Sequence, residues 1–251
     1  SRLYRAGRAG RRVESRTGGL ATAGQLGSAG QGDRVHLAVC VPGESMPIES
    51  VRSLTRMLLE CLRNPPQLHP ERHVREFVLS EHYLASSMLP YARAWLLDSA
   101  LKAGASHVLM LDSDMTFPPD TAHRLVEGAE RCGGFVAANC VTRRPPIRWT
   151  ARDISNGVHD SAKAIGLGIR WTTVQTVGVA VAMIRADLVE KIERPAFNFG
   201  LTPRGWVGED VWFAHRLAAA SIPVVVDNEL SMRVGHVGAH EFSPRDVERT
   251  E

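Results

Sequence analysis

Short apolar segments alternate with amphipathic helical patterns over residues 35–227, and this alternation limits the possible folds more than any other feature. The run 35–41 has the composition of a buried strand, whereas Val51, Leu54 and Leu58 recur at the three- and four-residue spacing of one helix face. The same reasoning predicts strands at 35–41, 74–79, 107–111, 135–141, 177–184 and 223–227, and helices near 47–63, 90–104, 118–133, 185–195 and 209–220. Such strand–helix units favour an α/β fold with a mostly parallel sheet and helices on both faces.

Two carboxylates follow the strand predicted at 107–111. Asp112 and Asp114 flank Ser113, and alternate residues of an extended chain point the same way. Paired carboxylates at a strand end repel each other unless a cation or a proton compensates, and Mg²⁺ or Mn²⁺ carrying phosphate oxygens is suited to that task. The alternative is an aspartate that caps the helix that follows.

The position of this pair favours a ligand site. In α/β sheets, ligands bind beyond the carboxyl ends of the strands. The polar segments Pro42-Gly43-Glu44, Ser80-Glu81 and 112–114 all follow predicted strands and should meet at that edge.

Two further clusters lie later in the chain. Glu209 and Asp210 are expected at a helix start, where an acid is also favoured simply by the helix dipole. His236 lies between Gly235 and a second nearby glycine after the last strand, and an imidazole there could be a further Mn²⁺ ligand or an ordinary surface or core histidine.

Several classes are disfavoured. The chain has no G-x-x-x-x-G-K-[ST] phosphate loop and no G-x-G-x-x-G after its first strand, which argues against P-loop nucleotidases and dinucleotide dehydrogenases. Residues 1–33 carry six arginines against Glu14 and Asp33, so the other 218 residues contribute −1 to the net charge of +3. We expect this Arg/Gly-rich head to be disordered, either as a basic arm or as a dispensable tail, and we expect no nucleic-acid partner for the folded body.

No apolar run approaches the length of a membrane span, and no secretory signal is recognisable. The four cysteines lack CxxC spacing and lie in apolar or helical patterns. They are expected to be buried free thiols, which predicts a cytoplasmic protein.

The motifs, in order, resemble those of a GT-A fold glycosyltransferase similar to family 2. They are Pro-x-Glu after the first strand, Ala92-Arg93, Leu111-Asp112-Ser113-Asp114, Gly208-Glu209-Asp210 and Gly235-His236-Val237-Gly238. The resemblance covers roughly residues 35–240 and implies a single GT-A (Rossmann-like) domain at 34–242, followed by a C-terminal tail at 243–251.

The resemblance also implies roles for individual residues. Asp112 and Ser113 would face the donor sugar and ribose, Asp114 would bind the metal, and His236 would complete the metal site. Pro42 and Glu44 would hold the nucleotide. Arg93 would lie near the donor, although Ala94 stands where the family has asparagine. Asp210 would be the general base, with Glu209 beside it.

The implied activity is a metal-dependent transfer of a sugar from a nucleotide-diphosphate donor to an acceptor hydroxyl, with inversion expected from family 2. The cofactor would be Mn²⁺ or Mg²⁺. A UDP-sugar is favoured and a GDP-sugar is possible, while the acceptor is not identified by any motif.

Three features of the sequence have more than one interpretation. Asp112-Ser113-Asp114-Met115-Thr116 also matches the D-x-D-x-[TV] motif of haloacid-dehalogenase-type phosphohydrolases, in which Asp112 would be a nucleophile, although here two strand–helix units precede the motif. Arg143, Arg144, Arg148 and Trp149, in the weakly patterned segment 142–175, could meet a diphosphate or an acceptor sugar or could form a solvated loop. Gly178 could allow close approach of the donor or could mark a bulge.

Overall fold

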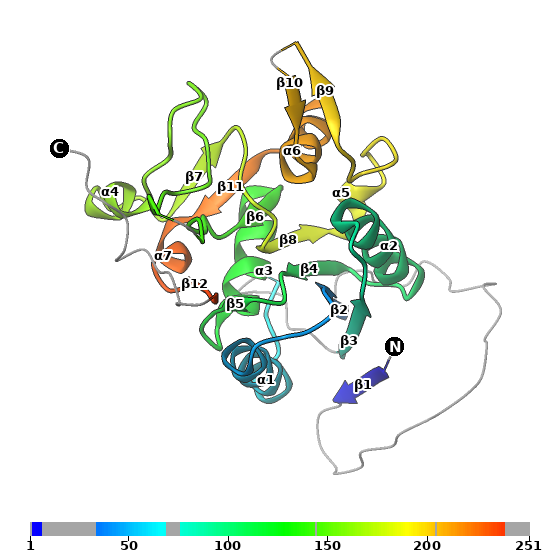
Figure 1. The fold of residues 1–251 in the computed structure, drawn as a ribbon. Helices are drawn as coiled ribbons and strands as arrows, with labels where there is room; N and C mark the ends of the chain where they lie inside the picture. Colours follow the sequence, from blue (N-terminus) through cyan, green and yellow to red (C-terminus); the bar gives the residue numbers. More distant parts are fainter. Residues whose placement is uncertain (1, 7–33, 69–75, 144, 204, 239–251) are drawn as a thin grey trace.

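The computed structural model describes residues 2–6, 34–68, 76–143, 145–203 and 205–238 (Figure 1). Its centre is an eight-stranded sheet in the order β1-β3-β2-β4-β8-β6-β11-β7. The strands of this sheet are β1 (Arg2–Ala6), β2 (Arg34–Pro42), β3 (Glu76–Leu84), β4 (His107–Leu111), β6 (Phe135–Ala137), β7 (Trp171–Val174), β8 (Val181–Arg185) and β11 (Val224–Asp227).

Helices cover both faces of the sheet because its central strands are apolar on both sides. Along β2, Ala38 and Cys40 belong to the hydrophobic layer under α2 and α6, whereas Leu37 and Val39 belong to the layer under α1 and α3. The helices are α1 (Ile48–Arg63), α2 (Leu89–Lys102), α3 (Thr121–Cys132), α4 (Ser161–Gly166), α5 (Ala186–Val189), α6 (Glu209–Ala219) and α7 (Asn228–Ser231). The described body is therefore a single mixed α/β domain with helices on both sides, as expected.

The sheet is more mixed than the expected mostly parallel arrangement. Parallel pairing joins β3-β2-β4 and β6-β11, but β8 is antiparallel to both β4 and β6. Between β6 and β8, the described residues of the chain form α4, which packs against α7, and then β7. Antiparallel β7 and β1 lie at the two ends of the sheet.

Several boundaries differ from the expectation. β6 ends at Ala137 instead of residue 141, and β8 begins at Val181, which leaves Gly178 in the preceding loop. The segment 142–175 is weakly patterned in sequence, yet it contains α4 and β7. A hairpin of β9 (Gly200–Thr202) and β10 (Gly205–Val207), which is not among the predicted strands, projects beside α6 at the top of Figure 1.

The head of the chain also departs from the expectation in part, since residues 2–6 form β1, antiparallel to β3. The rest of the predicted disordered segment and the predicted tail at 243–251 lie outside the described residues. Cys40, Cys61 and Cys140 are buried free thiols as predicted, whereas Cys132 is only partly buried. Among the helices that the structure describes, none has the length and apolarity to cross a membrane.

Candidate functional site

The loops after β2 and β4 meet at the carboxyl edge of the sheet. The two strands are parallel neighbours, so their ends at Pro42 and Leu111 lie side by side. Gly43 has a φ of +146°, and a Cβ built on it would lie 2.6 Å from Ser113 Oγ. A glycine is therefore needed here to let the two loops approach each other. Pro42 is buried and Glu44 is exposed in this loop, next to the paired aspartates.

Arg93, on the first half of α2, connects two motifs that are far apart in the sequence. Its guanidinium donates to Asp112 Oδ1 at 2.7 Å and to Glu209 Oε1 at 2.5 Å. The arginine side chain is only 3% exposed. Burial by itself lowers the pKa of Arg93, but the charges of Asp112 and Glu209 outweigh it and raise the pKa, so the side chain stays ionised. Arg93 thus lies at the sheet edge predicted to bind the donor, but its buried guanidinium contacts the protein's own carboxylates.

The contact with Arg93 distinguishes Glu209 from Asp210, the two acids at the start of α6. Glu209 is held by Arg93. Asp210 is partly exposed, and its carboxylate accepts a hydrogen bond from the neighbouring Val211 N–H at 2.7 Å. The helix begins after Gly208, which has no capping side chain. Asp210 is therefore the acid available to a ligand, and Glu209 is the acid that positions the helix start.

Asp114 and His236 come together through a small second sheet. β5 (Met115–Thr116) pairs with β12 (Gly235–His236), and Val237 N–H donates to the Asp114 carbonyl oxygen at 2.7 Å. This pairing brings His236 Nε2 to 3.3 Å from Asp114 Oδ1. The C-terminal loop thus returns across the sheet edge to the paired aspartates.

The orientation of the His236 ring is fixed by its other nitrogen. His236 Nδ1 lies 3.2 Å from the carbonyl oxygen of Val141, which can only accept, so Nδ1 carries the proton. Nε2 faces Asp114 and donates to it when it also carries a proton, whereas in the neutral ring its lone pair is available to a metal. Partial burial raises the pKa of Asp114, but the hydrogen bond from His236 and the charges of His236 and Arg143 outweigh it and bring the pKa below its usual range.

A hard divalent ion fits this donor set only with help from a ligand. One carboxylate and one imidazole with its second nitrogen bonded to a backbone carbonyl are suitable for Mn²⁺. Among the described residues, no cluster of three or more acidic, histidine or cysteine side chains with metal-site geometry occurs. The remaining coordination positions would have to come from phosphate oxygens and water, as in sites that bind a metal together with a phosphorylated substrate.

Gly178 is the predicted site residue that the structure does not bring against the aspartates. It lies in the loop before β8, and a Cβ built on it would find its nearest neighbour at Thr150 Oγ1, 3.6 Å away. That loop still reaches the site, since Ala180 accepts the Asp112 N–H through its carbonyl oxygen at 2.8 Å.

Three features of the site were missed or left open. The need for glycine at position 43 could have been inferred from the Pro-Gly strand end, whereas the exposed Trp206 of the β9–β10 hairpin carries no sequence signal of its own. Arg143 ion-pairs with Asp114 at 2.5 Å. Trp149, grouped with Arg143 by sequence, is instead buried with Val141 and Ile147.

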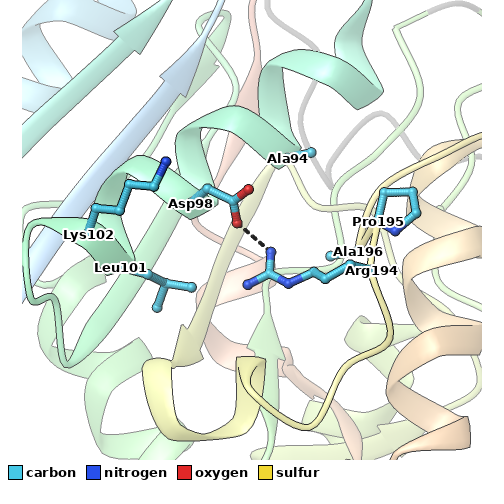
Figure 2. Close-up of a pocket in the computed structure, with 7 residues that line it drawn as sticks. All are labelled: Ala94, Asp98, Leu101, Lys102, Arg194, Pro195 and Ala196. Carbon is cyan, nitrogen blue, oxygen red and sulfur yellow. Dashed lines mark hydrogen bonds and ion pairs between the residues drawn. The ribbon is translucent and has the colours of Figure 1, made fainter.

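A separate open pocket of about 640 Å³ lies on the C-terminal half of α2 and contains none of the predicted site residues. Figure 2 shows Arg194 reaching across it to Asp98, with Lys102 directed away from this pair. We therefore place the candidate site at the carboxyl edge and not in this pocket.

No protein-family model and no curated protein matches the chain. Among solved structures, the crystal structure of A197 from STIV is similar, with a TM-score of 0.53 and 17% sequence identity. The match covers 84% of this chain and 91% of that one. At this identity the similarity shows a shared fold.

Proposed function

We propose that the protein is a metal-dependent glycosyltransferase of the GT-A type, which moves a sugar from a nucleotide-diphosphate donor to an acceptor hydroxyl. The observation that carries this proposal is the joining of four distant motifs at one sheet edge. Arg93 binds both Asp112 and Glu209. Asp114, which is two residues after Asp112, lies close to His236. The site has a metal-suited pair, Asp114 and His236, on one side and the partly exposed carboxylate of Asp210 on the other, which fits a group-transfer reaction.

The donor would bind over the loops after β2 and β4. Asp114 and His236 would hold Mn²⁺ or Mg²⁺, and this ion would stabilise the negative charge that develops on the departing diphosphate. Asp112 is fixed by Arg93 in one orientation and would accept hydrogen bonds from sugar or ribose hydroxyls through its partly exposed carboxylate. The loop of Pro42 and Glu44 would contact the nucleotide.

The acceptor would bind on the side of α6. Its hydroxyl oxygen attacks the anomeric carbon, the bond from that carbon to the diphosphate oxygen breaks, and Asp210 takes the hydroxyl proton. Attack on the face opposite the leaving group inverts the anomeric configuration. The β9–β10 hairpin leads directly into this helix and exposes Trp206 and Leu201 opposite each other, which would suit an apolar sugar face.

A parallel assay separates this proposal from the phosphohydrolase reading of the same aspartates. The protein is incubated with Mn²⁺ and either a panel of UDP- and GDP-sugars or p-nitrophenyl phosphate, and release of nucleoside diphosphate or of nitrophenol is measured. We expect release from one nucleotide-sugar that Asp210→Asn slows strongly. Turnover of the phosphate ester with no turnover of any nucleotide-sugar would contradict the proposal.

A further inference from the structure

The two oxygens of the Asp114 carboxylate already have cationic or ring-nitrogen neighbours. Oδ1 faces His236 Nε2 at 3.3 Å, and Oδ2 accepts from Arg143 Nη1 at 2.5 Å. Arg143 is 56% exposed, whereas Asp114 is 22% exposed. A guanidinium thus lies where a divalent ion bound to Oδ2 would have to lie.

The loop that carries Arg143 is anchored at its base and open at its tip. Val141 and Trp149 form an antiparallel bridge, and both are buried together with Ile147. The Thr142 N–H also donates to the Arg148 carbonyl oxygen at 2.9 Å. The loop is therefore held in place over the site, while the exposed side chain of Arg143 is free to change its partner.

The same loop contacts both members of the metal-suited pair. The Val141 carbonyl oxygen accepts from the His236 ring, and Arg143, two residues later, contacts Asp114. A change at Asp114 therefore acts directly on the loop that orients the histidine.

We propose that Arg143 is an exchangeable cation, which pairs with Asp114 when no metal is bound and moves to the donor diphosphate when the metal binds. This inference rests on the proposed function. A divalent ion and a guanidinium repel each other at one carboxylate, so metal binding weakens the pair of Arg143 with Asp114 and favours release of the arginine. A diphosphate arriving with the metal supplies new acceptor oxygens, and the planar fork of arginine is well matched to them.

The proposal predicts opposite effects of one substitution on two binding constants. With Mn²⁺ alone, followed by the electron paramagnetic resonance signal of the free ion, Arg143→Gln should bind the metal about two- to five-fold more tightly, the range expected from losing one largely exposed ion pair. With Mn²⁺ saturating, calorimetric titration of UDP should show roughly ten-fold weaker binding, because a charge-assisted hydrogen bond is lost. GDP serves as the second probe in the same titration.

Arg233→Gln is the matched control. Arg233 forms a similarly exposed pair with Asp120 at 2.8 Å, three residues before His236, and has no contact with Asp114. Both binding constants should stay near those of the wild type in this variant. A far-ultraviolet circular dichroism spectrum and a melting curve of each variant test whether Arg143→Gln and Arg233→Gln are folded like the wild type.

The outcomes distinguish this inference from the proposed function. If the wild type binds Mn²⁺ and UDP or GDP and Asp114→Ala abolishes this binding, the proposed function stands. Under those conditions, an Arg143→Gln protein whose metal affinity is unchanged or weakened overturns the exchange, as does a control that behaves like Arg143→Gln. If the wild type binds neither metal nor nucleotide, the proposed function and the exchange fail together.

Discussion

Replacing Arg93 by methionine is the perturbation with the largest expected effect on the site. Methionine is a long, flexible apolar side chain that can fill much of the arginine's space but provides no charge. The change leaves the carboxylates of Asp112 and Glu209, which both contact the guanidinium, facing each other without a cation. The loss should therefore appear in stability as well as in activity.

The magnitude follows from the burial of the three groups. Removing one partner of a fully buried pair costs about 3–5 kcal/mol. Here the arginine is 3% exposed, but Asp112 and Glu209 are 23% and 14% exposed and keep some water. We therefore expect a loss near the lower end, about 3 kcal/mol in the free energy of unfolding. For a domain of this size that corresponds to a fall in Tm of about 6–12 °C.

Urea unfolding followed by tryptophan fluorescence measures this loss. The matched control is Arg194→Met, which breaks the pair with Asp98 in the pocket of Figure 2, whose partners are 43% and 50% exposed. That change should cost no more than about 1 kcal/mol. The double variant Arg93→Met/Glu209→Gln should be less destabilised than the sum of the single changes by about 1 kcal/mol or more. A loss at Arg93 no larger than the control, or strict additivity with Glu209, would refute the connecting role of Arg93.

Three further predictions follow from the general base, the Gly43 turn and the buried histidines. Asp210→Asn should lower kcat by about 10²–10⁴-fold in the nucleotide-sugar assay and leave the Kd for the donor nearly unchanged, because a general base acts on the acceptor proton. Gly43→Ala should lower Tm and weaken UDP binding, since the new methyl group would meet Ser113 at a positive φ; an unaltered protein by both measures would show that the loops have room. Burial lowers the pKa of both His36 and His82, so these side chains take up protons more readily in the unfolded state. Their contribution to stability is therefore present above pH about 6.5 and is lost as the pH falls through their folded pKa values. Urea unfolding at pH 7.5 and 5.5 should show this loss of stability, and the loss should be smaller in His82→Gln.

The parts of the fold that local sequence determines were predictable. The helix α1 follows from its apolar spacing and stops at Asn64 before two prolines, and α3 ends at Gly133, which adopts a left-handed conformation. β4 occupies the predicted residues because a short apolar run is bounded on both sides by polar ones. In each case the information lies within a few residues of the element.

The remaining features depend on contacts between distant segments. The antiparallel direction of β8 depends on the connection between β6 and β8, and the residues of β8 themselves do not indicate it. The pairing of Arg93 with Asp112 and Glu209 likewise joins three elements whose spacing in the sequence carries no regularity. Sequence motifs could place these residues at one sheet edge, but not show that Arg93 is buried behind the site.

The central claim is that the Asp114 carboxylate binds nucleotide through a divalent ion, and calorimetric titration of UDP and GDP with and without Mn²⁺ tests it most directly. The matched variants are Asp114→Ala and Asp120→Ala, the second removing a nearby aspartate that pairs with Arg233. We predict binding that requires Mn²⁺ in the wild type and in Asp120→Ala, and no such binding in Asp114→Ala. Nucleotide binding by Asp114→Ala that requires Mn²⁺ and matches the wild type in affinity would contradict the assignment.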